Sequence, residues 1–251
     1  MFMNNGGLSM KRTSFTIFII LLVILTGCQN VPGAVGNAKV ESRNMPLELT
    51  LTGVNVLGAY DVTIDPTLNG MAVLEGESDL LDAMDNRQSE TGVLELAFKP
   101  GTTLTTNKTV KARVPAFSHG LIRVSGEGTV LTQGENPMKG DVYEIEMGGT
   151  GAIDMALDAA TIKAAITGAG NITLSGSATT QTVEISGTGE YRGFQCKGSA
   201  AHVNITGNGN AQVYTDTELT GLISGAGNIL YDGNPQRVDI SGQGGGKAMK
   251  R

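Results

Sequence analysis

The second half of the chain repeats one short pattern: an aliphatic residue, any residue, an aliphatic residue, Ser or Thr, Gly, any residue and Gly. Copies occupy positions 122–128, 164–170, 183–189, 203–209, 221–227 and 238–244, with a variant copy at 143–151. The first glycines of the pairs are 17 to 23 residues apart. A repeat of this length is typical of a solenoid, in which each period forms one coil and neighbouring coils bury a shared core.

Within each period, apolar and polar residues alternate as they do in β-strands. Ile166, Ile172 and Leu174 are predicted to point into the core, while Thr167 and Thr173 point outward. A second short strand at 171–174 is followed by Ser and Gly at 175–178, so each coil should hold two strands and two bends. Stacked coils would then form parallel, in-register ladders about 4.8 Å apart.

The glycine pairs are predicted to be the corners of the coils. A corner that bends sharply and lies flush with its neighbours needs either a positive φ or the absence of a Cβ atom, and glycine provides both. Asn171, Asn210 and Asn228 follow the second glycine, where a side-chain amide can satisfy turn backbone or pair with the adjacent coil. The predicted corner glycines are Gly126, Gly128, Gly149, Gly151, Gly168, Gly170, Gly187, Gly189, Gly207, Gly209, Gly225, Gly227, Gly242 and Gly244.

Composition agrees with an all-β fold. The chain has 36 glycines, seven prolines and no tryptophan among abundant strand-forming residues. Its aliphatic content is sufficient for a continuous core, so the glycines do not indicate disorder. A propeller or an up-and-down barrel is the alternative, but the period is too short for a propeller blade and barrels lack such regular glycine pairs.

The N-terminus has the features of a secretory signal. Lys11 and Arg12 precede an apolar run at 15–25 that is short for a membrane-spanning helix. The following Leu-Thr-Gly-Cys at 25–28 resembles the lipobox of bacterial lipoproteins, which implies cleavage before Cys28 and attachment of diacylglycerol and a fatty acid such as palmitate to that residue. An uncleaved membrane helix with an incidental cysteine is the alternative.

The predicted organisation is a signal peptide at 1–27, a linker at 28–39, the solenoid at 40–244 and a disordered tail at 245–251, which lacks apolar residues to pack. Cleavage before Cys28 would change the formal charge from −6 to −8, because two cations and no acids are removed. Such a charge argues against nucleic acid and anionic lipid surfaces as partners. Cys196 would be the only other thiol, so no disulfide is predicted, and it is expected to be a small buried residue.

No catalytic, metal-binding or cofactor-binding residues are predicted. His119 beside Ser118 and His202 on a strand belong to no catalytic motif, and two histidines with one spare cysteine are too few for a zinc site. The Gly-x-Gly pairs do not continue into a nucleotide-binding loop. The segment 148–154 resembles a calcium-binding nonapeptide, but its Asp154 is one place late and no second copy follows.

The densest charge lies at 75–85, where Ser78 is placed to cap a short helix. The acids of this segment are predicted to form a solvated loop face, with divalent-ion binding as the alternative.

At Gly170-Asn171-Ile172 and again at 227–229 the chain resembles the bacterial "putative autotransporter adhesin, head GIN domain" family. Segments at 62–64, 71–76, 79–81, 93–96 and 110–115, in this order, strengthen the resemblance, which extends over 40–244. It implies a right-handed, parallel β-helix-like solenoid in an envelope lipoprotein or secreted protein, without family catalytic residues to transfer.

The repeat is predicted to display a ladder of hydroxyls to solvent, which suits weak, multivalent contacts. The ladder consists of Ser125, Thr167, Ser186, Thr206, Ser224 and Ser241. The predicted function is therefore that of a non-catalytic surface protein, held to the membrane by lipid on Cys28, that binds an extracellular glycan or protein. Two alternatives remain. One is a polysaccharide-processing enzyme, because β-helices often host sugar lyases and hydrolases, although the outward positions here are mainly Thr, Ser, Asn and small residues. The other is a structural spacer of the envelope.

Overall fold

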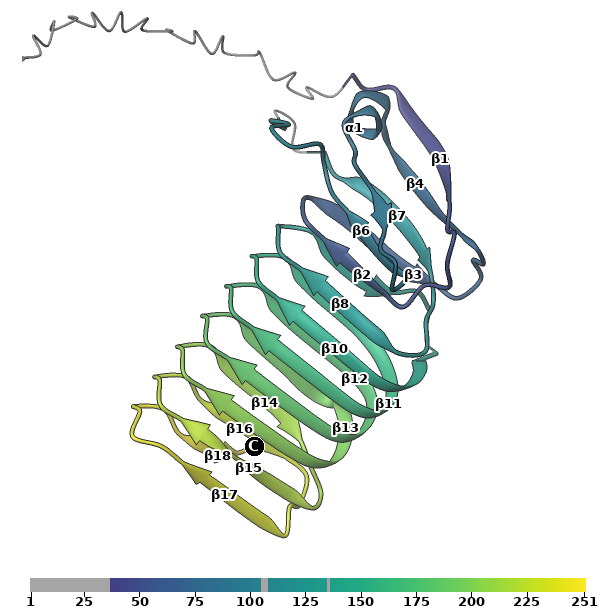
Figure 1. Ribbon diagram of the computed structural model, residues 1–251. Coiled ribbons are helices and arrows are strands. Elements are labelled where there is room, and N and C mark those ends of the chain that lie inside the picture. Colours follow the sequence, from purple (N-terminus) through teal and green to yellow (C-terminus); the bar gives the residue numbers. More distant parts are fainter. Residues whose placement is uncertain (1–36, 105–107, 135) are drawn as a thin grey trace, which may run out of the picture. The chain divides into compact units, whose positions relative to one another are not determined.

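A computed structural model describes residues 37–104, 108–134 and 136–251 (Figure 1). The signal segment, Cys28 and most of the predicted linker lie outside the described residues. The described part is almost entirely β-structure, and its main body is a solenoid of about seven turns. The predicted all-β, β-helix-like fold is confirmed.

The elements are β1 (Val40–Pro46), β2 (Gly53–Val56), β3 (Tyr60–Asp65), β4 (Met71–Glu77), α1 (Ser78–Asp82), β5 (Arg87–Gln88), β6 (Val93–Leu96), β7 (Val110–Pro115), β8 (Gly120–Val124), β9 (Thr129–Thr132), β10 (Met138–Met147), β11 (Ala152–Ile166), β12 (Asn171–Ile185), β13 (Glu190–Ile205), β14 (Asn210–Tyr214), β15 (Glu218–Ile223), β16 (Ile229–Asp232), β17 (Arg237–Ser241) and β18 (Ala248–Lys250).

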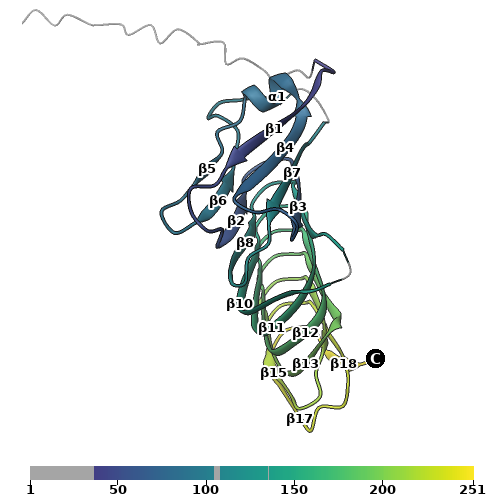
Figure 2. The ribbon, with the colours of Figure 1, turned by 90° about the vertical axis from the view of Figure 1, so that its right-hand side faces the viewer.

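Each coil contributes to two parallel sheets that lie on either side of the core (Figure 2). Sheet A stacks β7, β3, β9, the first halves of β11, β12 and β13, and then β14, β16 and β18. Sheet B stacks β6, β2, β8, β10, the second halves of β11 to β13, and then β15 and β17. The long strands bend between the sheets without interruption, where the sequence pattern predicts two separate strands.

The core lies between the sheets and consists of vertical columns of apolar side chains. Ile153 pairs with Ile172 in sheet A, and Ile166 pairs with Ile185 in sheet B. Ile166, Ile172 and Leu174 are completely buried, as the alternating pattern predicted. Burial of such a column is the main favourable term for adding a coil, because a single coil cannot cover its own apolar face.

The glycine corners connect sheet B back to sheet A, and each corner lies directly on the one before it. The N–H groups of Ser186 and Gly187 both donate to the carbonyl of Ile166, and those of Thr188 and Gly189 both donate to the carbonyl of Gly168, at 3.0 to 3.2 Å. This close stacking, rather than an unusual φ, is what requires glycine. Among the predicted corner glycines only Gly242 has φ in the left-handed region, at 140°.

The asparagines after the corners connect consecutive coils, in agreement with their predicted role. The side-chain oxygen of Asn171 accepts from the N–H of Glu190 at 3.2 Å, that of Asn210 from the N–H of Asn228 at 2.9 Å, and that of Asn228 from the N–H of Lys247 at 3.0 Å. These bonds reinforce the ladder at the point where each coil enters sheet A.

The N-terminal end of the predicted solenoid differs from regular coils. β4 pairs antiparallel with both β1 and β7, and β5 pairs antiparallel with β6. The helix α1 buries Leu80 and Leu81 against this end. Ser78 does not cap the helix as predicted: Glu77 is the N-cap residue, and the Ser78 hydroxyl instead accepts from the Asn37 side chain at 2.8 Å.

The tail at 245–251 corrects the expectation of disorder. Its residues 248–250 form β18, which extends sheet A by pairing with β16. The N–H of Arg251 donates to the carbonyl of Tyr231 at 2.9 Å, and its guanidinium lies 5.0 Å from the centre of the Phe194 ring. Backbone pairing and this cation–π contact thus order a segment that has little apolar content.

Candidate functional site

One exposed row of hydroxyl groups follows the corners along the edge of sheet B. Each member ends the aliphatic pattern of its coil, just before the first corner glycine, so the stacking of coils places them in line about 4.8 Å apart. The hydroxyl row consists of Ser125, Thr167, Ser186, Thr206, Ser224 and Ser241, all exposed, and is interrupted at Gly148. Among the hydroxyl groups of this row, only that of Ser241 has a hydrogen-bond partner in the described part of the chain, the carbonyl of Gly221 at 3.4 Å.

A shallow depression of about 310 Å³ lies along the middle of this row. Its polar lining comes from three successive coils and combines hydroxyls, a carboxylate and a carboxamide, with small or aliphatic residues between them. The depression is lined by Ala165, Thr167, Glu184, Ile185, Ser186, Asn204, Thr206 and Leu222.

A second depression of about 240 Å³ adjoins the first on the outer face of sheet B. The two share Ala165 and Glu184, and the small Ala165 side chain leaves room between its larger neighbours on the coils before and after. Lys163 forms an ion pair with Glu144 at 2.9 Å beside this space. The combined surface carries hydrogen-bond donors and acceptors, together with positive and negative charges, over several coils. Such a surface suits an extended hydroxylated or amide-rich ligand.

The residues considered for catalysis do not come together. His119 contacts only its neighbour Ser118, with Nδ1 and Oγ 3.2 Å apart, in the exposed connection before β8. His202 lies on β13, where its Nδ1 hydrogen-bonds the hydroxyl of Thr220. Neither contact supplies the nucleophile, base and orienting acid of a hydrolytic triad.

Cys196 is completely buried on β13, as predicted, and burial raises the pKa of its thiol to about 12. A protonated thiol is a poor nucleophile.

A buried polar cluster beside Cys196 was not predicted from the sequence. Gln181 donates to the carbonyls of Cys196 and Tyr214 and accepts from the Tyr191 hydroxyl at 2.7 Å. The only signal for this cluster was a glutamine at an inward position of the repeat.

The acidic side chains of the described residues do not gather into a metal site. No group of three or more His, Cys, Asp or Glu side chains there could hold a metal ion. Within the acidic segment 75–85, Glu75 is exposed, whereas Glu77 is buried, so the predicted solvated face is only partly present.

The described part of the chain has no helix that is both long enough and apolar enough to span a bilayer.

Comparison with known families decides the relationship suggested by the repeats. The family model described as "Putative auto-transporter adhesin, head GIN domain" matches residues 50–235, about three quarters of the chain. The chain belongs to this family. The match includes the hydroxyl row from Ser125 to Ser224, both depressions and the coils between them.

Solved structures share the fold. A "putative adhesin" from Bacteroides fragilis has a TM-score of 0.79 at 18% identity and covers 86% of this chain and 99% of its own. A "Putative lipid binding protein" and a "putative adhesin" from Parabacteroides distasonis have TM-scores of 0.71 and 0.63 at 22% and 21% identity, each over 86% of this chain and 98% and 99% of their own. No curated protein matches the sequence.

Proposed function

We propose that this protein is a lipid-anchored adhesin of the bacterial envelope that binds an extended surface glycan or protein along its hydroxyl row and performs no catalysis. The observation that carries this proposal is the row itself. Thr167, Ser186 and Thr206 are exposed, aligned on consecutive coils and not engaged by the fold. Their regular spacing suits a ligand that is itself repetitive.

The adhesin description of the family supports a position at the cell surface. The lipobox-like sequence before Cys28 supplies the anchor in this proposal, since the acyl chains would hold the domain to the membrane. Many anchored copies could then engage one polymer, and this multivalency would compensate for weak single contacts.

The depressions favour binding over sugar cleavage. Hydrolysis of a glycosidic bond requires two carboxyl groups about 5 to 10 Å apart across the scissile bond, one of them protonated at neutral pH. In the two depressions Glu144 and Glu146 are each held in an ion pair, with Lys163 and Arg123 respectively, so neither carboxyl group is free to approach a scissile bond. The surface is therefore better suited to recognition than to general-acid catalysis.

A triple substitution tests the site. Thr167→Ala, Ser186→Ala and Thr206→Ala together remove three hydroxyl contacts of about 1 kcal/mol each, which should weaken binding roughly 100-fold. The measurement is retention of densely coated beads on an array of cell-surface polysaccharides and proteins, compared with the soluble protein. The wild-type beads should bind far better than the soluble protein.

The opposite bend of the solenoid provides a matched control. Thr179, Ser199 and Thr217 are exposed hydroxyl residues on three successive coils there. Replacing all three by alanine should leave binding unchanged. Loss of binding in this control, with retention in the corner triple variant, would place the ligand elsewhere; turnover of an arrayed polysaccharide that is abolished by His119→Ala or His202→Ala would favour the enzyme alternative.

A further inference from the structure

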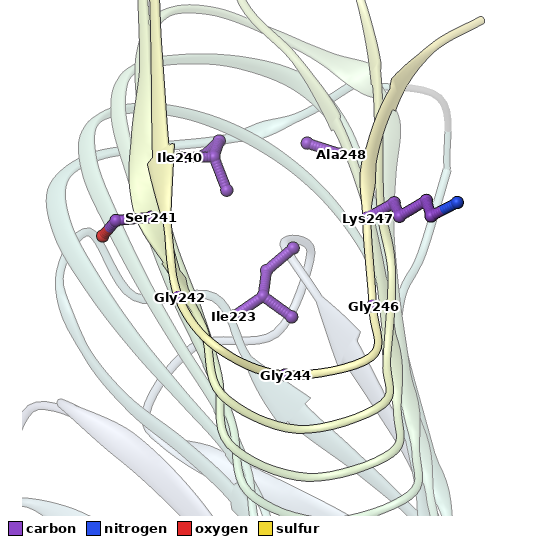
Figure 3. Close-up of a pocket in the computed structure, with 8 residues that line it drawn as sticks. All are labelled: Ile223, Ile240, Ser241, Gly242, Gly244, Gly246, Lys247 and Ala248. Atoms are coloured by element: carbon purple, nitrogen blue, oxygen red, sulfur yellow. The ribbon is translucent and has the colours of Figure 1, made fainter.

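The C-terminal end of the solenoid leaves part of its core open. The last coil forms a hollow of about 420 Å³ in which Ile223, Ile240 and Ala248 point inward, while Ser241 and Lys247 point away (Figure 3). Val238 continues the column of the buried Leu219 but is 45% exposed, because no later coil among the described residues covers it. Apolar side chains oriented for burial thus meet solvent at this end.

The strand edges at the same end are also unpaired in the described part of the chain. β17 pairs only with β15, and β18 pairs only with β16. Each therefore presents one free row of backbone donors and acceptors, which is the usual template for adding another strand. The closing corner at 242–246 consists of four glycines and Gln243, so it presents little side-chain bulk to an approaching strand.

The N-terminal end is protected where the C-terminal end is not. The edge strand β1 runs antiparallel, carries the ion pair between Arg43 and Glu41 at 3.1 Å and ends at Pro46. The proline lacks a backbone N–H group and hinders the pairing of a further strand at this edge. The helix α1 covers the core there with Leu80 and Leu81. This asymmetry argues against head-to-tail stacking and favours the joining of two C-terminal ends.

The charges on β17 are complementary to those of a second β17. Arg237 and Asp239 both point outward and flank the inward Val238. A two-fold axis at Val238 would set two β17 strands antiparallel, with each Arg237 directly opposite Asp239 of the second copy and the two Val238 side chains in contact. Centring the pair at Asp239 instead would place like charges opposite each other.

We propose that the open end is a dimerisation surface, at which β17 of one copy pairs antiparallel with β17 of a second copy and the two solenoid cores become continuous. The crystallised neighbours are aligned over 98% or 99% of their own chains, so they carry no further domain over the corresponding end. A dimer of this kind would place the hydroxyl rows of the two copies at opposite edges of the joined sheet B, because the two β17 strands run antiparallel, and an anchor at each outer end.

Sedimentation equilibrium of residues 37–251, which span the described part of the chain, tests the proposal. The wild type should be a dimer. Arg237→Asp and Asp239→Arg each place like charges opposite each other and should raise the dimer dissociation constant at least about tenfold. The double variant restores opposite charges and should return the dissociation constant to near the wild-type value.

Arg192→Asp is the matched control. Arg237 and Asp239 of one copy form an ion pair two residues apart, at 2.7 Å, and Arg192 and Glu190 do the same at 2.8 Å in the interior of sheet A. The control substitution should not change association, and circular dichroism verifies the fold of every variant. A wild type that stays monomeric up to about 0.1 mM, or single variants that dimerise as the wild type does, would overturn the proposal. Loss of dimer without rescue in the double variant would overturn the antiparallel β17 register.

Discussion

Replacement of one corner glycine should destabilise the protein far more than its added volume suggests. A Cβ atom on Gly187 would lie 2.0 Å from the carbonyl oxygen of Gly168 and 2.6 Å from that of Thr167. Both oxygens are backbone atoms of the preceding coil and cannot rotate away. The coil that follows must therefore move by about an ångström before an ordinary contact distance is reached.

Such a movement acts on the corner hydrogen bonds. Four bonds join this corner to the previous one, at 3.0 to 3.2 Å, and each contributes about 1 kcal/mol. Loss of two to four of them gives a cost of about 2 to 4 kcal/mol for Gly187→Ala. In a domain of this size that corresponds to a decrease in Tm of roughly 4 to 16 °C. Gly187→Val should lower the free energy of unfolding further, because the branched side chain adds two methyl groups at the same crowded position.

Urea and thermal unfolding followed by far-UV circular dichroism measure this effect. Gly207→Ala should behave alike, since its Cβ would lie 2.2 Å from the Gly187 carbonyl oxygen. Gly245 is the control, because it lies in the last corner, where a Cβ atom would meet no other atom within 4 Å, and its replacement by alanine should change stability by less than about 0.5 kcal/mol. If Gly187→Ala unfolds at the same temperature and urea concentration as the wild type, the corners are not closely stacked.

Three further predictions concern individual residues. Cys28→Ser should move the protein from the membrane fraction to the soluble fraction, and unchanged membrane association would contradict lipid anchoring. Cys196 should resist alkylation at pH 8 in the folded protein and react once it is unfolded, because burial raises its pKa to about 12; equal rates would show that the thiol is accessible. Hydrogen bonds from Thr67 lower the pKa of Asp65. Its stabilising contribution should thus be present above about pH 4 and lost as the pH falls further, so Asp65→Asn should be less stable at pH 7 and flatten the acid limb of a pH–stability curve.

Much of the fold could be predicted because the repeat encodes it redundantly. The burial of Ile166, Ile172 and Leu174 follows directly from alternation, and each coil restates the same pattern. The asparagine bonds from Asn171 and Asn228 were also accessible, since a short amide after a corner can reach the next coil. Local periodicity and long-range pairing coincide in a solenoid, which is why sequence patterns are so informative here.

Features that depend on the ends of the stack could not be predicted in this way. The antiparallel pairing of β4 with β1 and β7 has no repeat to reveal it. β18 has little apolar content, and its order comes from backbone bonds to β16, whose availability is a property of the assembled sheet. Likewise, the inward Gln181 departs from the apolar pattern, and the sequence does not show why. The structure explains it, because its side chain bonds to the Tyr191 hydroxyl and the Cys196 carbonyl.

The hydroxyl row could be predicted from the repeat, because Ser or Thr precedes the first glycine of nearly every pair, but only the structure shows which hydroxyls the fold leaves free. Thr215 and Thr206 are the same residue type in neighbouring coils, but the Thr215 hydroxyl is buried and donates to the carbonyls of Ser199 and Glu218, at 2.6 and 2.9 Å. The fold therefore uses Thr215 to satisfy a bend, as a buried hydroxyl requires. Thr206 is exposed and lines a depression. Sequence identifies both as polar residues of a repeat, whereas only the structure separates hydroxyls that hold the coil together from hydroxyls that remain free to meet a ligand.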